Sequence, residues 1–292
     1  MDTARYLERI SDGVEHLPNL PTTLHKVLEV CDDPDPSASD INCVISLDPV
    51  LAAQVLKLVN SAYYSLPNKI VSLTRAIVML GTNTVKNLAL SLTVLGTFKG
   101  KGVAIASGLH ANQYWMHSLC VGVTAKVLAR IHGVSRSDQE EYFIAGLLHD
   151  LGKIPISREL PREMKGAVDK ARQQERCLFQ VEDEILGLDH AVVGAMVMKK
   201  WQLADVLHNV LLYHHRPLES PEEYRLMVVL VSLGNLYANI YQVGDAGDHF
   251  PSIPDTTDLL AHAEITWDTF MGLENIVHEE ISKAQVFLRA AQ

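Results

Sequence analysis

The sequence predicts an all-α fold, and three features support this prediction. Apolar residues recur at spacings of three and four along the chain, which is the period of an amphipathic helix. Capping residues, proline and glycine stand where such helices would begin and end. No segment shows a convincing alternation of apolar and polar residues, so strands are not expected. An apolar content of 48% over 292 residues fits one large or two small folded domains.

Local capping signals set the expected helix boundaries in the first third of the chain. Asp48 is expected to cap a helix whose first position is Pro49, a residue that suits the first helical turn. Ser72 is expected to cap the next apolar segment, and Gly81 to end it. A further helix is expected to start at Thr82. These signals predict three consecutive helices from residue 49 onward.

Two later segments carry the pattern of a capping box, in which a serine and a glutamate three residues later bond each other's backbone N–H groups. Ser137 and Glu140 precede one apolar helix, and Gly152 is its expected end. Ser220 and Glu223 precede another apolar helix. We therefore expect each serine to cap the helix that follows it.

Two polar segments interrupt the helical pattern and suggest domain boundaries. Residues 98–102 (Phe-Lys-Gly-Lys-Gly) are the strongest compositional break, and residues 244–258 combine polar residues with Gly and Pro. We predict an N-terminal helical lobe over residues 1–105, a second helical lobe over residues 106–245 and a C-terminal helical tail over residues 246–292.

The net charge of −10 argues against nucleic acid as a partner, because phosphate binding needs clustered Lys and Arg. The charge is unevenly spread, since residues 49–137 contain Lys and Arg but no Asp or Glu. These cations either occupy solvated positions on mostly buried helices or form a positive face for an anionic ligand or an acidic partner. The sequence leaves both interpretations open.

The cysteines predict a reducing environment, because the four of them lie far apart and form no Cys-x-x-Cys motif. Without a signal peptide, this pattern predicts a cytoplasmic protein that has no disulfides. The longest apolar stretch, residues 226–241, contains two asparagines and is shorter than the roughly 20 residues of a membrane span. It is predicted to be a buried helix, and no membrane association is expected.

Thirteen histidines are a high number, and several stand at the ends of separate predicted helices. Burying an imidazole is unfavourable unless it is bonded, so any one of them could be a hydrogen-bonded core residue. A shared metal site explains the group better, because imidazole and carboxylate together suit Fe, Mn, Zn and similar divalent ions. Asp150 could bridge two ions through its two oxygens. The residues of this group are His117, His149, Asp150, His190, His214 and His215.

Residues 145–153, which include His149-Asp150 and a following Leu-Gly-Lys, resemble the signature of the HD superfamily of metal-dependent phosphohydrolases. Other segments resemble the HDOD family within that superfamily, and together the resemblance covers roughly residues 15–245. The segments that carry the HDOD resemblance are residues 17–21, 48–49, 60–64, 75–81, 182–187, 189–191, 193–195, 201 and 213–215.

The resemblance implies an all-α fold in which an N-terminal helical lobe packs on a degenerate HD lobe. It also implies a bacterial signal-transduction module, whose partner would be a signalling protein or a phosphate-bearing small molecule. Related HD-GYP phosphodiesterases place metal ligands at the positions that correspond here to His117, His149, Asp150, His190, His214 and His215.

Two departures from the superfamily pattern affect the expected metal content. Asn235 stands where the superfamily has a late aspartate, and Gln113 stands where HD-GYP enzymes often have a glutamate. Both amides remove a negative charge, which weakens a site for a hard cation. No Gly-Tyr-Pro segment follows His215. One ion is therefore expected rather than two, held by the complete set Asp150, His190, His214 and His215, while His117, His149, the shared Asp150 and Asn235 form a weaker half-site.

Two functions are compatible with this pattern. The family resemblance favours a regulatory module with a partly retained metal site and little or no catalysis. The retained ligands also fit a metal-dependent phosphohydrolase acting on a nucleotide, in which metal ions polarise the phosphoryl group. In that enzyme, Lys153 would be the catalytic residue that neutralises the charge developing on phosphate.

Overall fold

The computed structural model describes the chain except for residues 1–2, 32, 34–35, 100–108, 251–255 and 291–292. The described residues form α-helices and one short 3₁₀ helix, and none of them lies in a strand. The predicted all-α fold is therefore confirmed.

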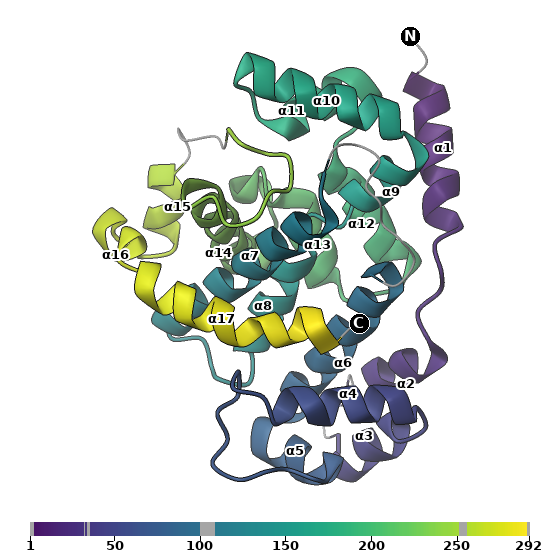
Figure 1. The fold of residues 1–292 in the computed structure, drawn as a ribbon, viewed down its shortest axis with the longest axis vertical. Helices are drawn as coiled ribbons and strands as arrows, with labels where there is room; N and C mark the ends of the chain where they lie inside the picture. Colours follow the sequence, from purple (N-terminus) through teal and green to yellow (C-terminus); the bar gives the residue numbers. More distant parts are fainter. Residues whose placement is uncertain (1–2, 32, 34–35, 100–108, 251–255, 291–292) are drawn as a thin grey trace.

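The helices follow one another with short connections (Figure 1). Their bounds are α1 Thr3–Glu15, α2 Thr22–Cys31, α3 Ala38–Ile45, α4 Pro49–Val59, α5 Leu73–Leu80, α6 Thr82–Lys99, α7 Ala111–Ile131, α8 Gln139–Leu148, α9 Lys153–Glu159, α10 Pro161–Gln174, α11 Leu178–Leu186, α12 His190–Lys200, α13 Asp205–Tyr213, η1 Pro217–Glu219, α14 Glu222–Ile240, α15 Thr256–His262, α16 Trp267–Met271 and α17 Glu274–Ala290.

Helix α7 is the centre of the fold, and its residues are buried along most of its length. It packs against α8, α14 and α17. Close approach of α7 and α8 depends on Gly122, where a Cβ atom would lie 2.5 Å from the backbone oxygen of Phe143. In Figure 1, α17 runs across α7 and α8 toward the N-terminal helices.

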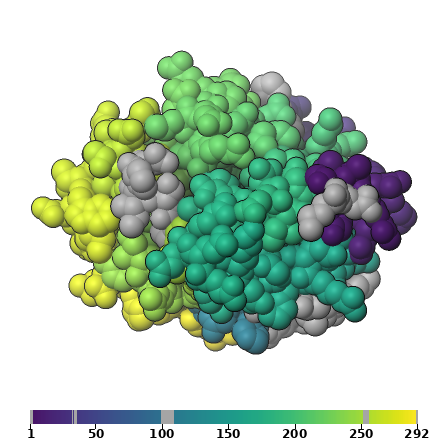
Figure 2. Space-filling view, turned by 90° about the horizontal axis from the view of Figure 1, so that it is seen from above, coloured from purple at the N-terminus to yellow at the C-terminus, as the bar shows by residue number. Residues whose placement is uncertain are grey.

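Helices α2 to α5 gather at one end of the molecule, and α6 connects them to α8 (Figure 1). Helix α1 instead packs on α9, α11 and α12, and the Trp201 indole donates to the Pro18 carbonyl oxygen at 3.0 Å. Helices α10 and α11 cover the opposite end, as Figure 2 shows in teal. The predicted boundary at residue 105 lies outside the described residues, and the three-part division remains a prediction.

A partly buried polar cluster joins the N-terminal helices to α7 and α8. The Lys126 ammonium on α7 donates to the Glu140 carboxylate on α8 and, at 2.9 Å, to the Tyr63 hydroxyl. The Tyr64 hydroxyl donates to the same Glu140 oxygen at 3.1 Å. The ammonium also stands 4.4 Å from the centroid of the Tyr63 ring, in cation–π contact. We call these four residues the interlobe cluster; each of their buried polar atoms has a partner.

The capping predictions for the first helices are confirmed. The Asp48 carboxylate accepts from the backbone N–H groups of Val50 and Leu51, with Pro49 at the first helical position. Ser72 caps α5, and Gly81 ends it with φ +89°. These signals act within one turn of chain, which explains why the sequence alone locates them.

Both predicted capping boxes are wrong. Helix α8 has Asp138, not Ser137, at its N-cap, and Asp138 makes no capping hydrogen bond. The Glu140 carboxylate accepts from Lys126 and Tyr64 instead of a backbone N–H at the cap. Helix α14 begins after Pro221, and the Ser220 hydroxyl donates to the Pro217 carbonyl oxygen instead. In both places the side chain that the local pattern assigns to the cap binds another group: Glu140 binds residues of other segments, and Ser220 binds the preceding turn.

Within the described part of the chain, no single helix is both long and apolar enough to cross a membrane. The pair α5–α6 passes the same length and composition test only together, and it is bent by 117°.

Candidate metal centre

The predicted ligands come together from four parts of the chain. His117 lies on α7, His149-Asp150 follows α8, His190 begins α12, and His214-His215 follows α13. Asp189 caps α12 by accepting from the Val192 N–H, which fixes where His190 starts the helix.

The turn that carries Asp150 fits tightly against α12. A Cβ atom at Gly152 would lie 2.0 Å from the His190 carbonyl oxygen and 2.5 Å from the Gly194 nitrogen. Only glycine leaves room for this approach, which brings the Asp150 carboxylate to His190. The Leu-Gly-Lys segment after the aspartate therefore has a steric function in the site.

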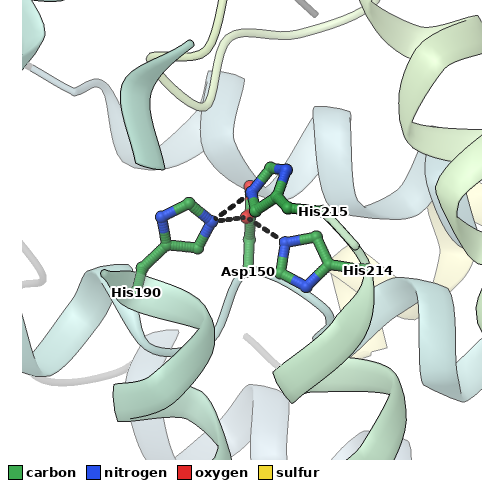
Figure 3. Close-up of side chains that lie close together, drawn as sticks. All are labelled: Asp150, His190, His214 and His215. Carbon is green, nitrogen blue, oxygen red and sulfur yellow. Dashed lines mark hydrogen bonds and ion pairs between the residues drawn. The ribbon is translucent and has the colours of Figure 1, made fainter. Parts of the chain in front are cut away.

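Asp150 is the common member of two groups of side chains. Its Oδ1 lies 3.1 Å from Nε2 of His190 and 3.7 Å from Nε2 of His214, and the His190 and His215 Nε2 atoms are 2.9 Å apart (Figure 3). We call Asp150, His190, His214 and His215 the first half-site. Two nitrogens bound to one ion at roughly 2.1 Å would lie about 3.0–3.4 Å apart, close to this separation.

The second group lies on the other oxygen of the carboxylate. Oδ2 of Asp150 is 3.4 Å from Nε2 of His149 and 3.8 Å from Nε2 of His117. We call His117, His149 and Asp150 the second half-site. In each half-site the potential ligand atoms lie within 4.8 Å of one another, so the cluster could hold a metal ion.

The histidines are oriented by hydrogen bonds on their far nitrogens. Nδ1 of His149 bonds the Gly146 carbonyl oxygen, and Nδ1 of His214 bonds the Leu211 carbonyl oxygen, both at 2.8 Å. A carbonyl oxygen can only accept, so each Nδ1 carries the proton and each Nε2 presents a lone pair toward Asp150. This is the arrangement that metal-binding histidines adopt.

A buried carboxylate plays the same part for His190. Oε2 of Glu182 accepts from the backbone N–H of His190 at 2.9 Å and from its Nδ1 at 2.5 Å. Both side chains are fully buried. Glu182 belongs to a segment that carries the family resemblance, but the sequence did not reveal its contact with His190. The signal that could have indicated a buried partner is a charged residue on the apolar face of a short helix.

Several ligand-type atoms of the cluster have no hydrogen-bond partner among the described residues. They are Nε2 of His117, His149 and His214 and Oδ1 of Asp150. Buried polar atoms are nearly always bonded, and an unpaired one costs about 1–3 kcal/mol. An ion in the first half-site would satisfy Nε2 of His214 and Oδ1 of Asp150, and only an ion in the second half-site would satisfy Nε2 of His117 and His149. The donor set of each half-site therefore fits a metal ion.

Electrostatics keep most of these imidazoles neutral. Burial lowers the pKa of His117 to about 4 and that of His149 to about 3. Burial also lowers the pKa of His190, but the Glu182 and Asp150 carboxylates outweigh it and raise the pKa to about 9. Burial disfavours the charged form of Asp150, yet His149 and Lys153 hold its pKa well below the usual value. At neutral pH the cluster thus combines a protonated His190 and an ionised Asp150 with imidazoles that are neutral at the other positions.

Lys153 lies inside the cluster rather than at its edge. Its side chain is 1% exposed, and its ammonium donates to Oδ2 of Asp150 at 2.7 Å. Asn235, which the sequence analysis assigns to the second half-site, lies close enough to His117 to raise its pKa. The second half-site therefore contains an ammonium group and a neutral amide in addition to its histidines.

A cavity of about 50 Å³ adjoins the first half-site. Phe179 stacks on the His215 ring there, with ring centroids 4.4 Å apart and planes at 15°. Asp248 is 5% exposed, accepts from the Leu178 N–H, and has a pKa that burial raises. Sequence reasoning missed both residues, because Phe179 has an ordinary core pattern and Asp248 lies in a segment interpreted only as a linker.

Comparison with known proteins agrees with this architecture. The family model described as "HDOD domain" matches residues 17–217. A protein of Treponema pallidum (strain Nichols), named "Uncharacterized protein", is 28% identical over 236 residues, which are 80% of this chain and 44% of that protein. The chain thus spans less than half the length of this relative.

Three solved structures share the fold. An HDOD domain protein of unknown function from Geobacter sulfurreducens has a TM-score of 0.76 and 24% identity, covering 98% of this chain and 99% of that one. A "Putative phosphohydrolase" from Shewanella amazonensis SB2B has a TM-score of 0.73 and 22% identity, covering 97% and 98%. A "Putative signal transduction protein" from Marinobacter aquaeolei VT8 has a TM-score of 0.75 and 18% identity, covering 100% and 66%.

At these identities the three structures establish the fold. The family model extends over more than half of the chain and includes His117, His149, Asp150, His190, His214 and His215. The chain therefore belongs to the HDOD domain family.

Proposed function

We propose that this chain is a bacterial signal-transduction module that holds one divalent transition-metal ion of the Fe, Mn or Zn type and has little or no catalytic activity. The ion is held in the first half-site by Asp150, His190, His214 and His215. Imidazole and carboxylate donors suit these metals. The signalling assignment also agrees with the name of the Marinobacter protein that shares the fold.

The observation that carries the one-ion proposal is the position of Lys153. Its ammonium occupies the side of Asp150 that faces His117 and His149, 2.7 Å from Oδ2. A cation is thus already present where a second metal ion would bind. Asn235 adds no negative charge to offset a second divalent ion.

The absence of strong catalysis follows from the same geometry. Phosphodiester hydrolysis is best served by two ions about 3.5–4 Å apart, one for the attacking and one for the leaving oxygen. Lys153 is bonded to Asp150 and buried, so its ammonium is not free to neutralise charge on a phosphate. A small phosphate-bearing molecule remains a proposed ligand of the metal-containing pocket.

A signalling-protein partner is proposed to dock on the N-terminal helices. Leu47, Val50, Val71, Val78 and Met79 are exposed large apolar side chains on or beside α3, α4 and α5, and these helices contact one another. Exposed apolar groups that gather in this way mark interaction surfaces. Nucleic acid is not proposed as a partner, because the chain is acidic.

The second candidate function is a metal-dependent phosphohydrolase. The observation in its favour is that all five predicted histidine ligands converge on the Asp150 carboxylate. A bound ion would supply Lewis-acid polarisation of the phosphoryl group. In this alternative Lys153 would have to leave Asp150 to contact phosphate.

The two functions are separated by metal content and turnover measured together. Purified protein, reconstituted with Mn²⁺, Fe²⁺ or Zn²⁺ in turn, is analysed for metal and then assayed with bis(p-nitrophenyl) phosphate and a cyclic dinucleotide. We expect one ion per chain and no turnover above that of a His149→Ala control. Two ions per chain, with turnover that His149→Ala abolishes, would establish the enzyme instead.

A further inference from the structure

A second and larger cavity, of about 260 Å³, lies between the N-terminal helices and the helices that carry the metal ligands. It shares no lining residue with the cavity beside His215. Its walls come from α2, α6, α8, the start of α13 and the loop before it. The apolar part of this lining is Leu28, Leu90, Ile144, Leu203, Val206 and Leu207.

One polar side chain in this lining lacks a partner. Asn87 on α6 is 5% exposed, and its amide nitrogen has no hydrogen bond to any described residue. A buried amide group left in this state costs about 1–3 kcal/mol. A carboxamide offers a donor and an acceptor side by side, so a molecule with a complementary amide edge would satisfy it.

The charged groups around the cavity indicate the charge of the molecule that fits. Burial raises the pKa of Glu141 on α8, and the positive charge of Lys86 on α6 partly opposes this shift. Asp205, at the first position of α13, adds a second carboxylate to the lining. The cavity therefore has no excess positive charge for an anionic group, and its wall is otherwise apolar.

We propose that this cavity is a binding site for a small, neutral, amphipathic molecule that carries an amide-like edge. Its apolar body would lie against Leu90, Ile144 and Leu207, and its amide edge would bond the Asn87 carboxamide. The volume is close to the lower end of the range for small-molecule sites, about 300–1,000 Å³.

The position of the cavity gives it a route to the metal centre. Helices α8 and α13 line the cavity through residues near their N-termini, Glu141 and Ile144 on one and Asp205 to Leu207 on the other. The same two helices lead at their C-terminal ends into His149-Asp150 and His214-His215. A ligand that shifts α8 along its axis would alter both half-sites, and one that shifts α13 would alter the first, so we expect occupancy of the cavity and of the metal site to be coupled. This coupling rests on the proposed function, whereas binding to the cavity does not.

The binding test uses the full chain with labelled Ile, Leu and Val methyl groups, titrated with benzamide and isovaleramide and followed by NMR. Both amides should give saturable shifts at Leu90, Ile144 and Leu207, with affinities on the order of 1 mM for molecules this small. Benzoate has the same ring with a charged carboxylate, and it should bind about tenfold more weakly or not at all.

Two variants decide whether the shifts come from this site. Asn87→Leu removes an unsatisfied buried group, so it should fold at least as stably as the wild type while weakening both amides about tenfold. Leu90→Trp is expected to fill the cavity and abolish binding. No saturable shift from either amide, or amide affinities unchanged in Asn87→Leu, would overturn the proposal.

Coupling is measured by repeating the amide titrations with Zn²⁺ bound. Linkage requires that Zn²⁺ change amide affinity by the same factor by which the amides change Zn²⁺ affinity, and we expect a change of about fivefold or more. Equal amide affinity with and without Zn²⁺ would refute the coupling but leave the proposed amide-binding site supported. Failure of the chain to take up Zn²⁺ would refute the proposed function and leave the amide titrations valid.

Discussion

Two polar clusters lie at opposite ends of α8, and they differ in how their hydrogen bonds are completed. In the interlobe cluster, Lys126 and Glu140 pair with each other and with two tyrosine hydroxyls, and no buried polar atom is left over. Around Asp150, three imidazole nitrogens and one carboxylate oxygen face one another without a hydrogen bond. Both clusters contain charged groups with little exposure to solvent, but only the second is incomplete.

The difference shows what distinguishes a structural polar cluster from a binding site. A closed network holds elements together and needs nothing further, and Tyr63 extends it into a tight aromatic group with Phe143 and Phe287. The cluster at Asp150 is held open by groups behind it, including Glu182 and the backbone carbonyls of Gly146 and Leu211. Those groups fix the imidazoles while leaving their inner nitrogens available for an ion.

The largest expected effect is the loss of metal from Asp150→Asn, which keeps the size of the side chain and removes the charge that both half-sites share. Metal affinity should fall by more than about 100-fold, since replacing an outer partner alone lowers it about 10–100-fold. Equilibrium dialysis followed by elemental analysis measures the change. Metal content equal to that of the wild type would show that Asp150 is not a metal ligand.

Glu140→Gln makes the matching change in the interlobe cluster. It leaves the Lys126 ammonium, which is 22% exposed, without its carboxylate, so the free energy of unfolding should fall by about 2 kcal/mol. Urea denaturation followed by circular dichroism measures this loss. Metal content should stay at the wild-type level; a variant that also loses metal would show that the two clusters are not independent.

Glu182→Gln tests the group behind His190. The substitution keeps the shape of the side chain but weakens the acceptor for the His190 Nδ1 proton, so metal affinity should fall about tenfold while the saturated stoichiometry is unchanged. A competition titration against a metal-binding dye gives the affinity. An unchanged affinity would mean that the orientation of His190 does not depend on this carboxylate.

Asn235→Asp should have the smallest effect, because it restores a charge to the second half-site while Lys153 still occupies part of it. We expect the metal-to-chain ratio to rise above one only under excess metal. The double substitution Asn235→Asp with Lys153→Gln should bring the ratio closer to two. Ratios that stay at one in both variants would show that packing, not charge, closes this half-site.

The sequence predicted the fold class and identified the side chains that meet at Asp150, because both depend on patterns that are local in the chain. Asp48 and Ser72 cap their helices through bonds within one turn, and His149-Asp150 is recognised as a contiguous segment. Asn235 was placed beside the second half-site by resemblance, and the structure puts it next to His117.

The features that the sequence did not reveal are contacts between distant segments. The local pattern predicts that Glu140 belongs to a helix cap. Its actual partner, Lys126, lies on another helix, and the sequence does not show that contact. The sequence also does not show whether the Lys153 ammonium binds Asp150 or points toward a ligand; the structure shows it on Asp150. Asp248 and Phe179 reach the site from elements that carry no motif, so only their packing around His215 identifies them.

The central claim is that the open cluster around Asp150 holds one divalent transition-metal ion in its first half-site. Anomalous diffraction from crystals of protein reconstituted with Zn²⁺, collected on both sides of the zinc absorption edge, tests it directly. The account predicts one strong peak, bonded to Oδ1 of Asp150 and to Nε2 of His190, His214 and His215, with the Lys153 ammonium still on Oδ2. A cluster without a peak, or a peak between His117 and His149 with Lys153 displaced, would contradict it.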